Sequence, residues 1–406
     1  MRLLHTSTLE FQEFLDTNIP RYAILSHTWG TEEVTFEDMR ERREAAMQMA
    51  GYEKIKQCCK KAAQEGFDYV WIDTCCIDKR SSAELSESMN AMYEWYRKSG
   101  SCYAYLADVP SECQPAAEDD AFRRSRWFTR GWTLQELIAP DRVQFFAQDW
   151  TKIGTKETLN QEIKLVTGIP LEVLNNSSVL RRTGVAQKMS WAASRQTARV
   201  EDIAYCLMGL FGVNMPMLYG EGQKAFQRLQ LEIIKKTYDH SIFAWKTTDH
   251  TRGLFACSPA DFVDSGHITP FHYYEFTTPY SVTNLGLSIK APMASSLFKG
   301  RYVAYLNCGY KKNSRGTTWI GIYLRKVSGN HYTRISCDDL GLLRQYSSYF
   351  RVTFKEGFKK ADNSNINLVN LNRETFELSV KWLHARVFDP APVNKRNDRV
   401  PSRRRG

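Results

Sequence analysis

The sequence lacks the C-x-x-C spacing that structural zinc sites and redox dithiols share, although it contains ten cysteines. Two pairs, Cys58-Cys59 and Cys75-Cys76, are directly adjacent in the chain. His240 and the later histidines lack metal-ligand spacing as well. We therefore predict no metal site, and we expect the thiols to be reduced and to pack as small apolar side chains.

Long hydrophobic runs are also missing. The most apolar segment, residues 203–218, is interrupted by two glycines, an asparagine and a proline, and is shorter than the ~20 residues of a membrane-spanning helix. The chain does not open with the cationic, apolar leader of a secreted protein, so we expect a cytoplasmic protein without a membrane partner. A G-x-x-x-x-G-K-[ST] phosphate loop is absent, which argues against hydrolysis of nucleoside triphosphates.

The formal net charge of +10 is concentrated at one end of the chain. Residues 391–406 hold six basic residues and one acidic residue, which is half of the net charge, and they show no apolar periodicity. We expect a basic, disordered tail there. A nuclear address in this tail is the alternative. The rest of the chain is nearly balanced in charge, so nucleic acid is not a predicted partner.

A chain of 406 residues with 43% hydrophobic residues predicts a globular protein of two or three domains. Strands and helices alternate early in the chain, apolar helical patterns follow, and runs rich in Tyr, Phe, Val and Thr come last. We predict an α/β domain with a mostly parallel sheet and flanking helices at 1–150, a helical annex at 151–250, a β-rich domain at 251–390 and the tail at 391–406.

Four apolar runs predict the strands of the α/β domain, at residues 22–26, 68–73, 101–107 and 142–147. Helical spacing of apolar residues links the first two runs, and Gly66 stands where a helix C-cap belongs. A Ser81-x-x-Glu84 capping box predicts the start of the next helix.

Polar residues cluster where the predicted strands end. Open α/β sheets bind ligands beyond the carboxyl ends of their strands, so these positions are candidates for a site, although such residues also cap helices and close turns. The residues are Ser26, His27, Trp29, Asp73, Asp78 and Asp108. Cys76 and His27 could form a nucleophile and base, but no third orienting group is evident, and core packing of Cys76 is favoured.

Trp132 and Glu136 are four residues apart and share a face of a predicted helix, opposite Leu134, Leu137 and Ile138. An aromatic side chain stacked one turn from a carboxylate, away from the helix's apolar stripe, suggests a functional surface. The alternative is a tryptophan that packs on a neighbouring loop beside a solvated glutamate.

Three segments resemble the signature blocks of the fungal heterokaryon-incompatibility (HET) domain family. They are Tyr22-Ala-Ile-Leu-Ser-His-Thr-Trp-Gly30, Tyr69-Val-Trp-Ile-Asp-Thr-Cys-Cys-Ile-Asp78 and Arg126-Trp-Phe-Thr-Arg-Gly-Trp-Thr-Leu-Gln-Glu136. Residues 191–245 are similar to the region that follows this domain in many fungal members. The resemblance implies a role in non-self recognition that triggers cell death.

The HET domain is regarded as a remote relative of the TIR domain, which has a flavodoxin-like sheet and in several branches cleaves NAD. The TIR motif Trp-Cys-x-x-Glu is similar to Trp132-Thr-Leu-Gln-Glu136, with Thr133 in place of the cysteine. The resemblance implies that Glu136 is catalytic and that NAD is a substrate rather than a cofactor. The substrate-binding residues would then be Ser26, His27, Trp29, Asp73, Arg130 and Trp132.

We therefore expect an effector that hydrolyses NAD once its HET domains cluster, as a homo-oligomer or with a HET-domain partner. An upstream sensor protein would supply the signal. The alternative is a non-catalytic adaptor whose HET domain only self-associates or recruits a partner.

Overall fold

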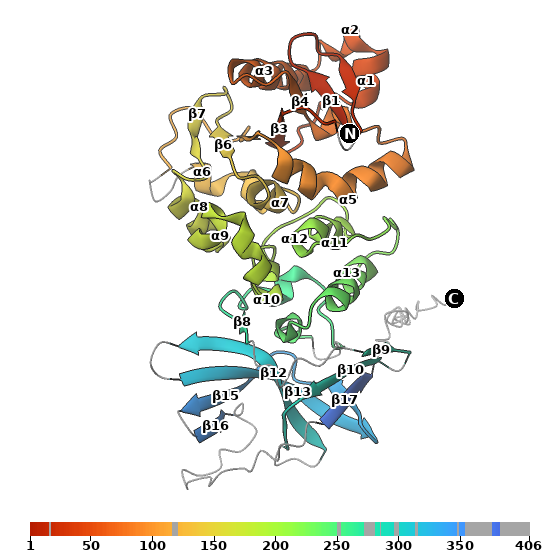
Figure 1. Ribbon diagram of the computed structural model, residues 1–406, viewed down its shortest axis with the longest axis vertical. Coiled ribbons are helices and arrows are strands. Elements are labelled where there is room, and N and C mark those ends of the chain that lie inside the picture. The colour runs from red at the N-terminus through yellow and green to blue at the C-terminus, as the bar shows by residue number, and fades with distance from the viewer. Residues whose placement is uncertain are drawn as a thin grey trace, which may run out of the picture.

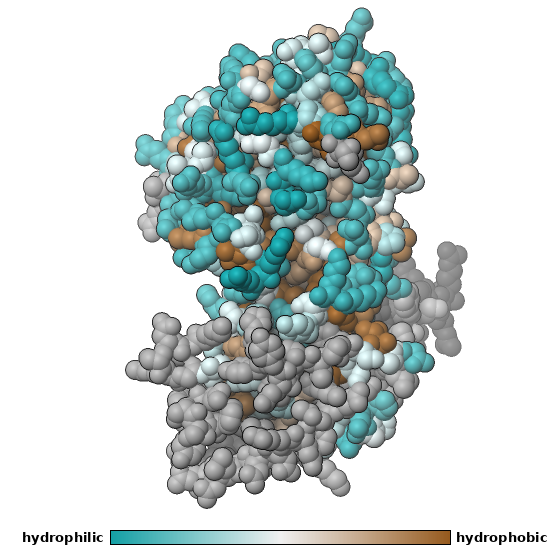
Figure 2. Space-filling model, in the orientation of Figure 1, coloured by the Kyte–Doolittle hydropathy of each residue, from teal (hydrophilic) through white to brown (hydrophobic). Residues whose placement is uncertain are grey.

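The computed structural model describes residues 1–15, 18–115, 121–249, 253–271, 281–284, 286–295, 300–312, 316–346, 349–353 and 376–381. An α/β region, a helical region and a β-rich region follow one another along its longest axis (Figure 1). The predicted tail at 391–406 lies outside the described residues. In the described ranges, no helix combines the length and the hydrophobicity that spanning a membrane requires. The face of the α/β region in Figure 2 is mostly hydrophilic.

The α/β region is built on a seven-stranded sheet of order β2-β1-β4-β3-β5-β6-β7. The four central strands β4, β3, β5 and β6 are parallel, which confirms the mostly parallel sheet, and the outer strands are antiparallel. The strands are β1 (Arg2–His5), β2 (Phe11–Glu13), β3 (Tyr22–His27), β4 (Tyr69–Trp71), β5 (Ser101–Tyr105), β6 (Val143–Phe146) and β7 (Lys152–Thr155).

Three of these strands were not predicted. The hairpin of β1 and β2 precedes the first predicted strand, and β7 lies in a segment that we expected to be helical. That expectation is wrong for residues 152–155, because β7 pairs with β6 and thereby satisfies the backbone groups along that strand's outer side. The pattern Lys-Ile-Gly-Thr is too short and too polar to predict a strand by itself.

Helices cover both faces of the sheet. On one face α3 packs against β6, where the Lys61 ammonium lies 5.4 Å from the centre of the Phe146 ring. On the other face α5 packs its Tyr96 against Trp71 of β4, and α7 lies beside it. The helices are α1 (Phe36–Glu41), α2 (Arg43–Ala46), α3 (Ala50–Gln64), α4 (Asp73–Cys76), α5 (Ser82–Lys98), α6 (Ala121–Arg124), the 3₁₀ helix η1 (Arg126–Thr129) and α7 (Thr133–Ile138).

Local signals in the sequence position two of these helices. The Ser81 hydroxyl accepts a hydrogen bond from the Glu84 amide and so caps α5, as predicted. Gly66, just after α3, has a φ of 79°, which confirms the expected glycine stop.

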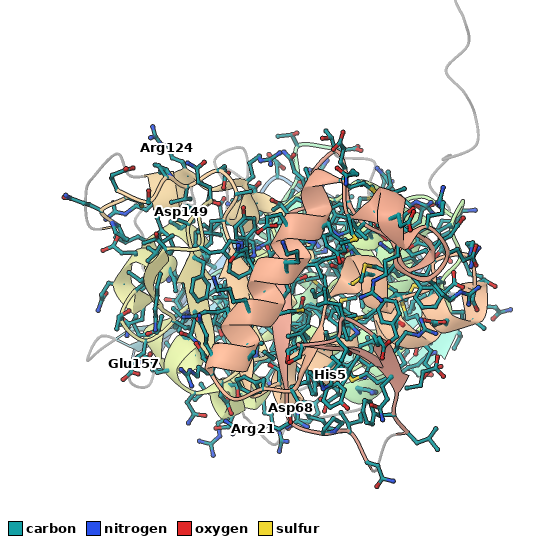
Figure 3. All side chains as sticks on the ribbon, turned by 90° about the horizontal axis from the view of Figure 1, so that it is seen from above. His5, Arg21, Asp68, Arg124, Asp149 and Glu157 are labelled. Carbon is teal, nitrogen blue, oxygen red and sulfur yellow. The ribbon has the colours of Figure 1, made fainter. Side chains whose placement is uncertain are left out.

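The carboxyl ends of the parallel strands meet at one edge of the sheet. Figure 3 looks down on the α/β region and shows Arg21 and Asp68, which precede β3 and β4, at one edge. Asp149, which follows β6, lies at the opposite edge. The residues that follow β3, β4 and β5 therefore share this second edge.

Residues 160–243 form a series of mostly short helices. Its longest helix, α13, buries Phe226, Leu229 and Ile233 along one face. The elements are α8 (Asn160–Thr167), α9 (Leu171–Asn175), η2 (Ser177–Arg182), α10 (Val185–Ser190), α11 (Asp202–Tyr205), α12 (Met208–Phe211), α13 (Lys224–Lys236) and η3 (His240–Phe243), with η4 (Pro259–Phe262) beyond it.

The described part of residues 251–390 forms a second, ten-stranded sheet, which confirms the β-rich region. Buried Arg334 joins it to the annex, because its guanidinium donates to the carbonyls of Phe243 and Trp245 and lies 3.7 Å from the Trp245 ring centre. The strands are β8 (Thr269–Pro270), β9 (Ser281–Thr283), β10 (Gly286–Ala291), β11 (Met293–Ser295), β12 (Arg301–Lys312), β13 (Gly316–Ser328), β14 (His331–Arg334), β15 (Gly341–Tyr346), β16 (Tyr349–Thr353) and β17 (Phe376–Lys381).

Candidate functional site

The candidate site lies where β3 meets its two parallel neighbours. The chain leaves β3 toward β4 on one side of it and returns as β5 on the other side. Such a reversal of strand order opens a crevice beyond the carboxyl ends of the strands, where α/β proteins bind ligands. Ser26 and His27 end β3 at this point, and they point to opposite faces because side chains alternate along a strand.

On the α7 face, Ser26 is bonded to Glu136. The Ser26 hydroxyl donates a hydrogen bond to the Glu136 carboxyl, and the Trp127 indole N–H donates to the same hydroxyl at 2.8 Å. The Tyr96 hydroxyl also lies beside the carboxyl, and it donates to the Leu25 carbonyl at 2.9 Å. Glu136 is only 7% exposed, so its carboxyl belongs to a closed polar cluster under the sheet edge.

Burial raises the pKa of Glu136 to about 8, because the ionised form loses its hydration. The hydrogen bond from Ser26 lowers this pKa in part, and the charge of Asp73 raises it further. The charge of buried Arg195 lowers the pKa of Glu136 in part. The Arg195 guanidinium donates to the Arg130 carbonyl at 2.8 Å and to the Thr133 hydroxyl at 2.9 Å. At neutral pH the carboxyl of Glu136 is therefore mostly protonated.

On the opposite face, buried His27 lies against Asp73, with 3.3 Å between the His27 Nε2 and a carboxylate oxygen. Neither ring nitrogen has a hydrogen-bond partner among the described residues. Burial, followed by the charges of Lys54 and Lys79, lowers the pKa of His27 well below its usual value, so the ring is neutral. A buried, neutral imidazole with both nitrogens open can bind a polar ligand.

Trp29 forms the outer wall of this part of the site. Its indole N–H donates to the second Asp73 carboxylate oxygen at 2.7 Å, and the Lys79 ammonium lies 3.6 Å from the centre of its ring. Trp29 is 48% exposed, so a flat ring of a ligand could stack on it. His27, Trp29 and Asp73 thus lie together on this face, whereas Ser26 and Glu136 contact each other on the α7 face.

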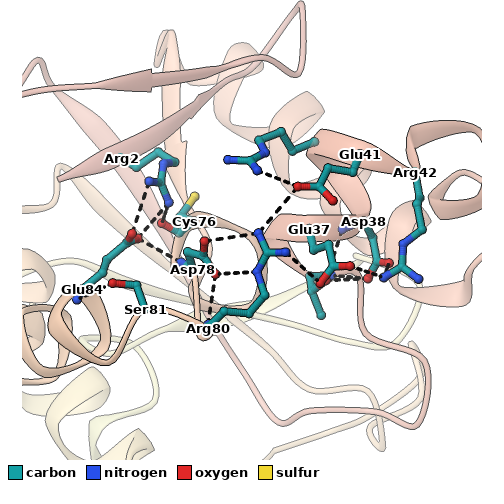
Figure 4. Close-up of polar contacts among 12 residues, drawn as sticks. Arg2, Glu37, Asp38, Glu41, Arg42, Cys76, Asp78, Arg80, Ser81 and Glu84 are labelled. Carbon is teal, nitrogen blue, oxygen red and sulfur yellow. Dashed lines mark hydrogen bonds and ion pairs between the residues drawn. The ribbon is translucent and has the colours of Figure 1, made fainter.

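A network of ion pairs holds the loop that carries Lys79 (Figure 4). The Asp78 carboxylate accepts from Arg80, and Arg80 also pairs with Glu37 of α1. Arg2 of β1 pairs with Glu84 of α5 at 2.8 Å. Asp78 therefore serves to fix the loop.

Trp132 and Glu136 do not form the shared outward face that we expected. The Trp132 indole lies beside the Asp202 carboxylate of α11 and lowers the pKa of that carboxyl in part, and all six residues of α7 are buried. The expectation was wrong because the annex covers the side of α7 that the sheet leaves free. Arg130 uses its backbone carbonyl to hold Arg195.

Two further candidates have structural roles. Asp108 accepts hydrogen bonds from the Ser125 hydroxyl at 2.7 Å and the Arg126 amide at 2.8 Å, and so caps η1. Cys76 is buried, as expected for core packing, and its sulfur accepts from the Ile72 amide at 3.4 Å. In the described ranges no group of three or more His, Cys, Asp and Glu side chains is placed to hold a metal.

Sequence analysis did not single out Tyr96, Trp127 and Arg195 as neighbours of Glu136. Tyr96 is one of several apolar residues at helical spacing, so nothing marked its hydroxyl. Trp127 and Arg195 lie inside the segments that carry the family resemblance. Their position in those segments was the only feature of the sequence that could have marked them as site residues.

Comparisons with known proteins support this resemblance. Residues 22–119 match the family model described as "Heterokaryon incompatibility protein (HET)", and residues 224–251 match a "Domain of unknown function (DUF8212)". The "Vegetative incompatibility protein HET-E-1" of Podospora anserina is 48% identical over 224 residues, which cover 53% of this chain and 16% of that protein. The chain thus spans a small part of that relative's length. No solved structure matches the chain.

Proposed function

We propose that this chain is an effector of fungal heterokaryon incompatibility whose HET region is a latent NAD glycohydrolase, with Glu136 as the catalytic carboxylate. The HET match and the similarity to a vegetative incompatibility protein support the biological role. The observation that carries the chemical proposal is the position of Glu136 beneath the end of β3. Its carboxyl accepts a hydrogen bond from Ser26, and the charge of Asp73 raises its pKa.

The order of the parallel strands supports the proposed kinship with TIR domains. Numbered along the chain, β3, β4, β5 and β6 stand in the order 2-1-3-4, which is the order of flavodoxin-like sheets. In that arrangement the ligand crevice lies between β3 and β5. Glu136 contacts both strands that would flank such a crevice, since its carbonyl accepts from the Cys102 sulfur of β5 and its carboxyl accepts from Ser26 of β3.

A single carboxylate is sufficient for the proposed reaction. Water replaces nicotinamide at the ribose carbon, the carbon–nitrogen bond electrons return to the pyridinium ring, and one proton goes to solvent. The leaving group departs neutral, so no acid has to protonate it, unlike in ordinary glycoside hydrolysis. Ionised Glu136 would stabilise the positive charge that develops on the ribose. Trp29 offers a ring for stacking.

The resting chain holds this carboxyl protonated and closed off, which supports the proposal of latency. Clustering, as a homo-oligomer or with a HET-domain partner under an upstream sensor, would move α7 and release Glu136 from Ser26. The carboxyl would then meet water and ionise, because most of the upward shift of its pKa comes from burial. We propose that this occurs in the cytoplasm.

Glu136→Gln tests the proposal without emptying the cluster. Glutamine has the shape of the protonated carboxyl and can accept the Ser26 bond, but it cannot ionise. The full chain, fused to an inducible oligomerisation module, should release nicotinamide from NAD, and Glu136→Gln should abolish the release. The exposed Glu172→Gln is the matched control and should keep it. NAD left intact by the clustered wild type would contradict the proposal.

A non-catalytic adaptor is the second candidate, and the burial of Glu136 within its own hydrogen-bonded cluster favours it. In an adaptor the carboxyl only stabilises the fold around Ser26 and Trp127. Overexpressed Glu136→Gln would then still kill cells, and cellular NAD would not fall. Loss of killing together with retained NAD in Glu136→Gln supports the hydrolase instead.

A further inference from the structure

A groove of about 830 Å³ opens where the three regions of the chain meet, away from the Glu136 site. Its walls come from α5, η2, α10, α12 and α13 and from β8 and β12 of the β-rich region. This volume lies within the range of about 300–1,000 Å³ that is usual for small-molecule sites.

The groove carries an excess of positive charge. Arg181 and Arg182 are exposed at its rim, and neither forms an ion pair among the described residues. The Lys188 and Lys236 ammonium groups donate to the carbonyls of Leu210 and Gly212. In the part of the chain that the structure describes, none of these four cations forms an ion pair with a carboxylate.

The acidic side chains of the groove are already engaged. Glu94 pairs with Arg97 at 2.6 Å, so these two charges cancel. The Asp239 carboxylate accepts from the amides of Val185 and Ser241 at 2.7 and 2.8 Å. The net charge of the lining is thus positive. Burial lowers the pKa of Lys188 to about 8, although the nearby charge of Asp239 raises it in part.

Asn307 of β12 adds a polar group that the protein itself leaves unsatisfied. Its side chain is 4% exposed, and its amide oxygen has no hydrogen-bond partner in the part of the chain that the structure describes. Buried polar atoms are rarely left in this state, because each costs about 1–3 kcal/mol. Asn307 is one of the lining residues of the groove, so its side chain can offer this oxygen to a hydrogen-bond donor of a ligand.

Aromatic side chains complete the lining. Tyr93 of α5, Phe211 of α12 and the exposed Tyr238 stand among aliphatic neighbours on the walls. Aromatic faces of this kind stack on planar rings. The groove therefore combines cations for a phosphate, a flat apolar wall and a buried acceptor.

We propose that this groove binds a small nucleotide, whose phosphates pair with Arg181 and Arg182 and whose ring lies on the aromatic wall. A hydroxyl or amino group of the ligand donates to Asn307. Such a ligand contacts a helix of the α/β region, the annex and the β-rich sheet at once, so its binding energy stabilises their arrangement. The site is independent of Glu136, and it assigns a ligand to the place where the three regions meet.

ADP is the probe, titrated into the full chain by calorimetry at physiological salt. We expect saturable binding that weakens at least about tenfold in the Arg181→Glu/Arg182→Glu variant, because both phosphate contacts are lost. The matched control Lys60→Glu/Lys164→Glu makes the same charge change on exposed helix surfaces outside the groove, and its affinity should stay within about twofold. Asn307→Leu should weaken ADP about fivefold while the backbone bonds of β12 remain.

Three results would overturn the inference. They are the absence of saturable ADP binding, equal ADP affinity in the arginine variant and the wild type, and inorganic phosphate or adenosine binding as tightly as ADP. Glu136→Gln should bind ADP normally, so a loss of NAD hydrolysis with retained ADP binding separates this site from the proposed catalytic one. A cooperative thermal transition in each variant checks that it is folded.

Discussion

The Ser26 hydroxyl at the end of β3 donates a hydrogen bond to the Glu136 carboxyl, which lies 110 residues later in the chain. The Trp127 indole donates to the same hydroxyl, so Ser26 links η1 and α7 to the central strand of the sheet. One small side chain thus satisfies two buried polar partners, and it holds the proposed catalytic carboxyl in its closed position.

Ser26→Ala should destabilise the protein by about 2 kcal/mol, because it leaves the Trp127 N–H and the Glu136 carboxyl without their shared partner. Chemical denaturation followed by tryptophan fluorescence measures the loss. The exposed Ser178→Ala is the control and should change stability by less than about 0.5 kcal/mol. Equal stability of both variants would show that the cluster contributes little.

The stability of the wild type should fall as pH rises from about 6 to 8. Glu136 has a pKa of about 8 in the folded chain, against an ordinary value of 4.5, so the folded state holds its proton more tightly than the unfolded state does. The contribution of protonated Glu136 to the free energy of unfolding is complete below pH 4.5 and is lost as pH rises toward 8. Roughly 2 kcal/mol of it is lost between pH 6 and 8.

Glu136→Gln removes this dependence, so the difference in thermal midpoint between variant and wild type should grow in favour of the variant as pH rises. Glu172→Gln, on the surface of α9, should follow the wild type at every pH. Parallel curves for wild type and Glu136→Gln would mean that Glu136 does not titrate in this window.

Gly209→Ala should destabilise the contact between α12 and α5 by about 1–3 kcal/mol, as overpacking does. A Cβ at Gly209 would lie 2.1 Å from the Tyr93 Cβ, which is close to the backbone and cannot rotate away. At exposed Gly30 the nearest atom to such a Cβ is 3.6 Å away, so Gly30→Ala is a tolerated control. Thermal denaturation compares the two, and similar midpoints would contradict the packing argument.

Arg334→Met should loosen the β-rich region from the annex. The substitution keeps an apolar stem on Trp245 but leaves the carbonyls of Phe243 and Trp245 without their donor. Limited proteolysis should cut between residues 245 and 260 several times faster than in the wild type. Exposed Arg325→Met in β13 is the matched control, and unchanged cleavage in both variants would rule out a role for Arg334 in docking.

The sequence alone predicted the parallel core of the α/β region because its strands are continuous apolar runs. A strand that is buried on both faces requires such a run. It can therefore be predicted without knowing which strands pair with it, as Tyr22–His27 illustrates. Caps are equally local, which is why Ser81 and Gly66 were predicted correctly. The strand-end positions of Ser26, His27 and Asp73 followed from the same runs.

Tertiary structure alone decided what those residues contact. Trp132 lies beside Asp202, and Glu136 accepts a hydrogen bond from Ser26. The sequence of α7 does not reveal these contacts, because the segments that bury the helix on all sides are far away in the chain. Strand β7 formed through pairing with β6 and not through its own pattern. The groove beside Asn307 exists only because helices and strands from three regions converge on it. Periodicity determines which side chains are buried, but hydrogen bonds between distant segments determine the chemistry that they can perform.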